Sequence, residues 1–284
     1  MKIGIAGGNG FIGKNVASYL RGKGAEVSII VRGDLENGGL KEKIRDCDVL
    51  VNLMGEPVNG FWTRGKRKKI YESRVLTTRR LIDFIEEFGR NITTFVQISG
   101  VGIYDNKHIH NEESKFTAYD FLSGVIVDWE KETRRLSVGG RRIVIMRMGI
   151  VLGNNGGILK TLLGPFRNGV GFTIKCDENF PFIHIKDVCG IVGLILDNTD
   201  IEGIINVVSP KQVTIHDFFS TLALYCHTRI IIPVAPAILH CILGESSVML
   251  THGQNVLPER LIGWGYSFQY GSLAQALTSI LEPD

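Results

Sequence analysis

The stretch Lys2-Ile-Gly-Ile-Ala-Gly-Gly-Asn-Gly-Phe-Ile-Gly13 decides the fold of this 284-residue chain. Residues 2–6 are typical of a short buried strand, and residues 14–21 are typical of a helix. The glycines between them satisfy both Gly-x-Gly-x-x-Gly and Gly-x-x-Gly-x-x-Gly. A strand, a glycine turn and a helix in this order predict an α/β fold that begins with a dinucleotide-binding βαβ unit.

Each glycine of the turn has a physical reason to be there. Gly7 or Gly8 allows a tight turn with backbone angles that a side chain forbids. Gly10 lets the backbone approach a pyrophosphate, and Gly13 lets the helix pack on the strand. Backbone N–H groups at the helix start then attract phosphate. We therefore predict a coenzyme pyrophosphate site formed by Gly7, Gly10, Phe11, Ile12 and Gly13.

The composition excludes several classes of protein. It is ordinary for a globular enzyme, with 44% hydrophobic and 21% charged residues, and a net charge of +3 does not argue for nucleic acid or an anionic membrane as partner. The five cysteines are scattered without a Cys-x-x-Cys motif, which indicates reduced thiols and no metal site. The most apolar run, residues 230–243, is too short to span a bilayer, and the first strand leaves no room for a signal peptide. We expect a cytoplasmic protein and leave its oligomeric state open.

Residues 27–32 predict the second strand, whose end would face the adenosine ribose of a dinucleotide. An acidic residue about 20 positions after the glycines would bind the 2′-hydroxyl of NAD. This chain instead has Arg32, 19 positions after Gly13. A guanidinium can clamp a 2′-phosphate, so the sequence favours NADP(H). Asp34 is the competing candidate for an NAD site, and a solvated Arg32 at the strand end is a third interpretation.

Residues 47–55 predict the third strand. Its end should carry four residues past the pyrophosphate and adenine: Asn52, Leu53, Met54 and Gly55. The basic residues 59–69 then predict a solvated helix start leading into a helix over 70–88, and an anion-facing loop is the alternative.

Residues 95–99 predict a strand that ends in Ser99, with Tyr104 close behind. Ser99 could bind a substrate carbonyl or hydroxyl, and Tyr104 could supply a phenol; alternatively they cap and pack the loop. His108 and His110 lie in a polar loop without other ligand spacing, so we expect them to be solvated. Residues 121–136 predict a helix and residues 142–147 another buried strand.

The pattern changes after residue 153. Residues 158–180 contain several glycines and a proline and predict no long helix, which suggests a smaller second lobe. Residues 182–187 predict a strand, followed by a helix over 188–197; His184 faces either the substrate or the core. The predicted Rossmann domain comprises residues 1–153 and 181–208, and the predicted substrate-binding lobe comprises residues 154–180 and 209–284.

Taken together, many segments resemble one family across nearly the whole chain: the nucleoside-diphosphate-sugar epimerase-like group of extended, atypical short-chain dehydrogenases/reductases, often named "epimerase family protein". The matching segments are Gly7 to Gly13, Val51 to Pro57, Trp62-Thr63, Ser73-Arg74-Val75, Ser99 to Tyr104, Asp120 to Leu122, Trp129-Glu130, Val151 to Gly153 with Gly156-Gly157, Phe182 to His184 with Asp187, Pro210 with Val213-Thr214, Gly253-Gln254, and Leu257 to Arg260.

The resemblance implies a doubly wound Rossmann domain that binds NADP(H) and a C-terminal lobe that closes over a small-molecule substrate. It also implies that the superfamily's Tyr-x-x-x-Lys pair is missing, since those places fall near Leu122 and Ile126. Two functions follow. The first is an NADP(H)-dependent oxidoreductase or epimerase acting on a hydroxyl or carbonyl compound or a nucleotide sugar, with Ser99, Tyr104 and His184 as candidate catalytic residues. The second is a non-catalytic NADP(H)-binding sensor or scaffold. The polar residues expected near the second lobe favour the enzyme.

Overall fold

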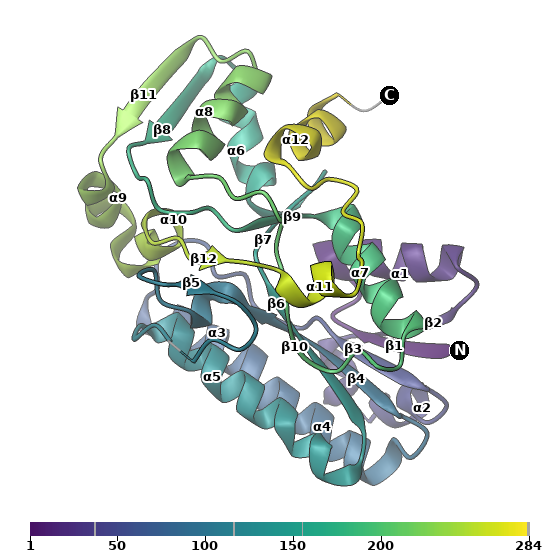
Figure 1. Ribbon diagram of the computed structural model, residues 1–284. Coiled ribbons are helices and arrows are strands. Elements are labelled where there is room, and N and C mark those ends of the chain that lie inside the picture. Colours follow the sequence, from purple (N-terminus) through teal and green to yellow (C-terminus); the bar gives the residue numbers. More distant parts are fainter. Residues whose placement is uncertain (37, 116, 155, 283–284) are drawn as a thin grey trace.

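A six-stranded parallel sheet forms the centre of the computed structural model, which describes residues 1–36, 38–115, 117–154 and 156–282 (Figure 1). In spatial order its strands are β10 (Gly203–Val207), β6 (Arg142–Met148), β4 (Thr94–Gly100), β3 (Val49–Asn52), β1 (Lys2–Ala6) and β2 (Glu26–Ile30). All neighbouring pairs in this sheet are parallel. The winding direction reverses between β1 and β3, and the carboxyl ends of strands at such a switch point are where doubly wound sheets bind ligands.

Helices cover both faces of this sheet. On one face lie α1 (Phe11–Gly22) and α7 (Ile185–Asp197); on the other lie α2 (Leu40–Ile44), α4 (Thr77–Phe88) and α5 (Phe121–Arg134). The apolar residues of the strands divide between the faces: Ile3 and Ile5 of β1 pack with α1 and α7, whereas Leu50 and Phe95 pack with α2 and α4. Burial on both faces explains why the strands are apolar throughout. The predicted doubly wound α/β fold is confirmed.

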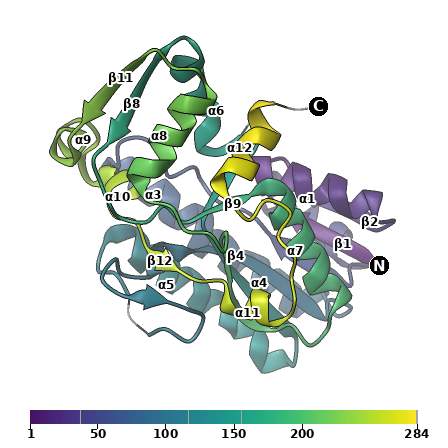
Figure 2. The same cartoon turned by 45° about the horizontal axis from the view of Figure 1, so that its top comes forward.

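A second cluster of buried side chains, which includes Phe166, Phe180, Phe218 and Phe219, forms the core of a smaller lobe (Figure 2). Its elements are α6 (Gly157–Arg167), β8 (Val170–Ile174), α8 (Ile215–Tyr225), β11 (Ile230–Val234), α9 (Pro236–Leu243), η5 (Gly244–Ser247), α10 (Val248–Thr251) and α12 (Leu273–Leu281). Strands β8 and β11 pair in parallel.

Two short strand pairs lie near the seam between the lobe and the main sheet: β7 (Ile150–Leu152) with β9 (Phe182–His184), and β5 (Ile109–His110) with β12 (Asn255–Val256). Residues 261–268, after the start of α11 (Glu259–Gly263), pack on the core around α1 and α7. The boundaries predicted for the two domains stay a prediction; residues 37, 116, 155 and 283–284 of that division lie outside the described residues.

Three predicted elements differ from the structure. The helix predicted to start within residues 59–69 and to continue over 70–88 does start there, as α3 (Arg64–Tyr71), where the Thr63 side chain caps it by accepting a hydrogen bond from the Lys66 N–H, but it does not continue unbroken. The π-helical turn η2 (Glu72–Leu76) then separates α3 from α4. The expectation of no long helix over 158–180 is wrong, because α6 buries Leu159, Leu162 and Phe166 on one side despite a proline in its last turn.

The third difference concerns the strand expected over 182–187, which stops at His184. There the His184 side chain caps α7: its Nδ1 accepts a hydrogen bond of 3.2 Å from the Lys186 N–H. The remaining short helical turns are η1 (Arg32–Leu35), η3 (Val101–Ile103) and η4 (Arg135–Gly139).

Candidate functional site

The glycine turn between β1 and α1 is shaped by two close backbone approaches. Gly7 has φ +80°, and a Cβ added there would lie 2.8 Å from the carbonyl group of Leu53. A Cβ added at Gly13 would lie 2.4 Å from the Gly7 oxygen. Gly10 is the N-cap of α1 and offers no side-chain hydrogen bond, so the N–H groups of Phe11 and Ile12 start the helix without a side-chain cap. Such a helix start can hold a phosphate.

The Phe11 ring anchors this turn to the rest of the protein. A Cβ added at Gly153 or Gly156 would lie 2.8 Å or 2.1 Å from ring atoms of Phe11. The ring therefore occupies space that the glycines after β7 leave open. This contact fixes the start of α1 against the segment that leads into the lobe, and it is where the structure places the predicted coenzyme residue Phe11.

The end of β3 lies beside the glycine turn. The Leu53 N–H donates to the Ala6 oxygen at 2.8 Å. The Asn52 side chain is fully buried; it donates to Thr78 and Gln97 and accepts a 3.2 Å hydrogen bond from the Met54 N–H. Asn52 therefore shapes the turn that follows β3, and any contact of this segment with a coenzyme would come from the main chain of residues 53–55.

A half-buried guanidinium faces the same turn. Arg74 lies in the π-helical turn η2, and its Nη1 donates to the Glu56 oxygen at 2.9 Å. Its Cζ lies 3.2 Å from where a Cβ of Gly55 would be, and 5.3 Å from the Trp129 ring centre. Within the described ranges no carboxylate lies at ion-pair distance from Arg74. Burial lowers the pKa of Arg74 to about 10, against an opposing effect of the Glu56 charge.

Asp34 and Arg32, the two candidate coenzyme-binding residues after β2, differ in their burial and in their hydrogen bonds. Asp34 is buried, and its Oδ2 accepts hydrogen bonds of 2.7 Å from the Val31 N–H and from Lys43. Burial by itself would raise the pKa of Asp34, but these hydrogen bonds outweigh it and lower the pKa. Arg32 is exposed. The Asp34 carboxylate is therefore occupied by hydrogen bonds within the protein, whereas the Arg32 side chain faces solvent.

A buried network joins the ends of β4, β6 and β10. The Ser99 hydroxyl donates to Glu130 at 2.8 Å, and Arg147 donates to both carboxylate oxygens of Glu130 at 2.8 Å. Arg147 also donates to the Tyr104 hydroxyl at 2.8 Å, and that hydroxyl donates to Asn206 at 2.9 Å. Burial would lower the pKa of Arg147, but the hydrogen bonds to Glu130 raise it. The structure thus brings Ser99 and Tyr104 into one network.

Tyr104 is 1% exposed, and burial raises its pKa. Its hydroxyl already has Arg147 as donor and Asn206 as acceptor, so in this conformation the phenol contributes to packing and polarity inside the protein. The two positions where the superfamily carries its Tyr and Lys are apolar: Cβ atoms added at Gly100 and Gly102 would lie 3.4 Å from Ile126 and 3.8 Å from Leu122. Helix α5 therefore places aliphatic side chains over the end of β4.

His184 lies elsewhere, at the start of α7. It is 2% exposed, its ring centre is 4.0 Å from that of Tyr270, and its Nδ1 accepts the capping hydrogen bond. Burial and then the charge of Lys186 lower the pKa of His184 to about 4. The structure does not place His184 in the Ser99 network. Catalytic roles for Ser99, Tyr104 and His184 stay predictions.

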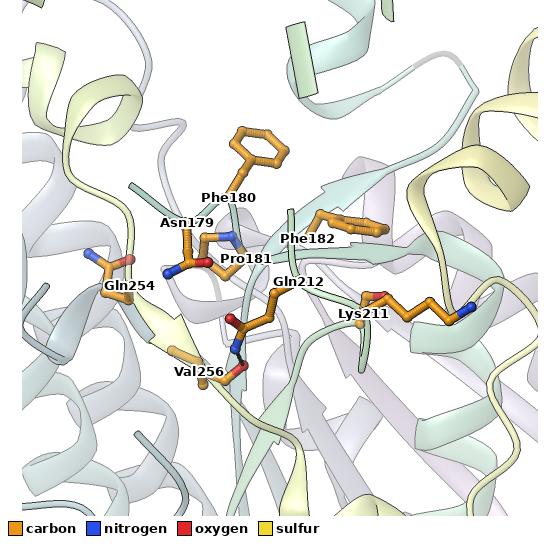
Figure 3. A pocket seen from close by; sticks show the side chains of 9 residues that line it. Asn179, Phe180, Pro181, Phe182, Lys211, Gln212, Gln254 and Val256 are labelled. Carbon is orange, nitrogen blue, oxygen red and sulfur yellow. Dashed lines mark hydrogen bonds between the residues drawn. The ribbon is translucent and has the colours of Figure 1, made fainter. Parts of the chain in front are cut away.

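A small hollow lies at the seam between the lobe and the sheet (Figure 3). Asn179, Gln212 and Gln254 gather around it, while the Lys211 side chain extends away from them. Val256 lines it and also packs in the buried cluster of Tyr104. The hollow therefore adjoins that cluster and is bordered by side-chain amide groups.

Other kinds of site find no support in the described part of the chain. It contains no group of three or more His, Cys, Asp or Glu residues placed to hold a metal ion. No helix among the described residues has the length and apolar character needed to cross a membrane. All five cysteines are free thiols, and Cys241 is the exposed one among them.

Sequence reasoning missed Arg74 and the Glu130–Arg147 pair. The signal available for Arg74 was its place in the segment Ser73-Arg74-Val75, one of those that carry the family resemblance. Glu130 and Arg147 are 17 positions apart on different elements, and no local pattern connects them.

The glycine turn at the switch point of a doubly wound parallel sheet, together with a C-terminal lobe, defines a Rossmann-fold protein of the extended short-chain dehydrogenase/reductase class. The chain belongs to the NAD dependent epimerase/dehydratase family, whose profile matches residues 3–207. Residues 234–280 match a second family, described as a domain of unknown function.

Relatives span the whole chain. Epimerase family protein SDR39U1 of Mus musculus is 32% identical, with 99% of this chain and 100% of the relative covered. YfhF of Bacillus subtilis is 30% identical, covering 99% and 98%. The crystal structure of human SDR39U1 isoform 2 with NADPH is 30% identical, covers 100% of both chains and has a TM-score of 0.92. UDP-glucose 4-epimerase of Thermus thermophilus, in complex with NAD, shares the fold at 16% identity, TM-score 0.80 and coverage of 99% and 98%.

Proposed function

We propose that this protein binds NADP(H) at the switch point between β1 and β3 and uses it as an oxidoreductase or epimerase-like enzyme on a small hydroxyl or carbonyl compound or a nucleotide sugar. The observation that carries the proposal is the half-buried Arg74 guanidinium, held beside Gly55 without a carboxylate at ion-pair distance in the described chain. A cation that is partly withdrawn from water is costly unless an anion accompanies it, and a coenzyme phosphate would be that anion. The human relative crystallised with NADPH supports the same coenzyme.

The residues present fit a dinucleotide. Side chains at positions 7 and 13 would fill the space where the strand, the turn and the helix meet, and the uncapped start of α1 offers N–H groups to a pyrophosphate. Exposed Arg32 suits a 2′-phosphate, and Asp34 is engaged with Lys43. These features favour NADP(H) over NAD(H).

The bound coenzyme would supply hydride chemistry, and the chain would supply orientation. The Ser99 hydroxyl donates a hydrogen bond to the Glu130 carboxylate, which also accepts two hydrogen bonds from Arg147. The Ser99 oxygen is then left as a hydrogen-bond acceptor. It would orient a substrate hydroxyl group better than a substrate carbonyl group.

A non-catalytic NADP(H)-binding module is the second candidate. One observation favours it: Leu122 and Ile126 stand over the end of β4, where the superfamily carries its proton-transfer pair. Such a module would bind a protein partner more tightly in one coenzyme state than in the other, and would not need the Ser99 hydroxyl.

Calorimetric titration with NADPH, NADP⁺ and NADH, followed by a screen of sugar nucleotides and small carbonyl and hydroxyl compounds, tests the proposal. We expect tighter binding of NADPH than of NADH, and turnover that falls in Ser99→Ala with NADPH affinity kept. Failure to bind either reduced coenzyme would contradict the proposal. Coenzyme binding without turnover across the screen, together with a partner whose affinity depends on NADPH, would support the sensor instead.

A further inference from the structure

The carboxylate of Glu56 stands among cations at the edge of the proposed coenzyme site. Lys66 Nζ lies 3.0 Å from its Oε1, and the two side chains are 22% and 27% exposed. The hydrogen bond from Lys66 is the main reason that the pKa of Glu56 is lowered, and the charges of Lys66, Arg32 and Lys69 act in the same direction. Strand β1 pairs in parallel with β2 on one side and with β3 on the other, so Arg32, two residues after β2, and Glu56, four residues after β3, lie at the same edge of the sheet. The carboxylate can therefore influence what Arg32 binds.

Both members of this ion pair are held on fixed backbone. The Glu56 N–H donates to the Ser73 hydroxyl at 2.9 Å, and the Glu56 oxygen accepts from Arg74. Lys66 lies in the first turn of α3, where its N–H is capped by Thr63. Because neither backbone is free to move away, a change in one charge would not be relieved by the loop swinging out.

An acidic group close to the adenosine end of the site would disfavour a phosphorylated coenzyme. A 2′-phosphate adds negative charge that NADH lacks, and a bare carboxylate near Arg32 would repel it and compete for the guanidinium. The pyrophosphate is common to both coenzymes, so its repulsion by Glu56 cancels in the ratio of their Kd values. Whether the Glu56 carboxylate is neutralised therefore affects the preference of the protein for NADPH over NADH.

We infer that Lys66 determines coenzyme specificity by neutralising Glu56, which leaves Arg32 available to the 2′-phosphate of NADP(H). Lys66 acts here through Glu56 as a positioning residue and makes no contact with the coenzyme. This inference rests on the proposed function and adds to it the pair of side chains that sets the preference.

The test is a double-mutant cycle on the full chain, measured as the Kd ratio of NADH to NADPH by calorimetry at low and moderate salt. Lys66→Met should lower this ratio about three- to tenfold, less at moderate salt because the charges are partly exposed. Glu56→Gln with Lys66→Met should restore the ratio to within about twofold of wild type, since the carboxylate is then gone. Lys68→Met is the matched control: it removes a lysine that is 73% exposed on the same helix and paired with Glu72, and should leave the ratio unchanged.

Two results would overturn the inference while leaving the proposed function intact. One is an unchanged ratio in Lys66→Met. The other is a double variant as poor as the single one, which would mean that Lys66 itself holds the phosphate. Wild-type protein that binds neither coenzyme would overturn the proposed function and this inference with it. Circular dichroism of each variant guards against loss of fold.

Discussion

Replacing Arg74 by methionine should change the stability of the fold and the affinity for the coenzyme in opposite directions. Methionine has a similar length and fills irregular space in an apolar environment. The substitution removes a half-buried cation that lies against Gly55 and Trp129. We expect the variant to unfold at a higher temperature than wild type and to bind NADPH more weakly.

The magnitude follows from the opposing contributions of the guanidinium. Burial lowers the pKa of Arg74 from 12.5 to about 10, which corresponds to a penalty of about 3 kcal/mol. Because the folded-state pKa lies below the unfolded value, this penalty is present throughout the accessible range and declines only above about pH 10. The variant loses a hydrogen bond worth about 1 kcal/mol and a cation–π contact worth about 0.5–1 kcal/mol. A net gain of about 1 kcal/mol remains, or roughly 2 °C in Tm.

Urea unfolding and calorimetric titration measure the two effects on the same samples. NADPH should bind about 10- to 100-fold more weakly, as expected when a charge-assisted hydrogen bond to phosphate is lost. Arg80→Met, which alters an exposed arginine of α4, is the matched control and should change neither quantity. A variant that is less stable than wild type by more than 1 kcal/mol, or that keeps wild-type affinity for NADPH, would refute the reasoning.

Three further predictions concern the turn, the cap of α7 and the buried network. Gly13→Ala would put a Cβ 2.4 Å from the Gly7 oxygen, so α1 must shift; calorimetry should show NADPH affinity reduced by more than about tenfold, while circular dichroism stays near wild type. The pKa of His184 is lowered to about 4 in the folded state, so its contribution to stability is complete above pH 6.5 and is lost as the pH falls toward 4. Urea unfolding should show that the free energy of unfolding of wild type falls by at most about 3 kcal/mol over this pH range. The variant His184→Asn, which keeps a capping side chain, should lose measurably less. Glu130→Gln leaves Arg147 buried without its counter-ion and should cost about 3–5 kcal/mol in the free energy of unfolding, whereas Glu130→Gln with Arg147→Met should cost less; equal losses would contradict the assignment.

The main elements were predictable where the signal was local. The strand that ends in Ser99, the helix over residues 121–136 and the strand over 142–147 follow from apolar spacing, and the structure places β4, α5 and β6 there. The predicted boundaries failed where a side chain decided them. His184 ends β9 before the predicted residue 187, because its side chain caps a helix whose start sequence periodicity places only approximately.

The candidate site was predictable to a smaller extent. The glycine turn and exposed Arg32 were expected, and the structure places both at the switch-point end of the sheet. The partner of Ser99 was not expected, because Glu130 is 31 positions away on a different element, α5, and no local pattern connects it to β4. Arg74 reaches Gly55 through a π-helical turn, a departure from regular helix that apolar periodicity does not indicate.

By itself, the sequence determined that this chain begins with a strand, a glycine turn and a helix, because close backbone approach and positive φ are requirements of single positions. Tertiary structure alone decided which polar and charged side chains are bonded to one another inside the protein. Asp34 is bonded to Lys43 and Ser99 to Glu130, whereas the Arg74 guanidinium faces the turn after β3. The physical reason is that burial and ion pairing depend on distances between elements far apart in the chain. Those distances exist only once the strands have taken their order in the sheet.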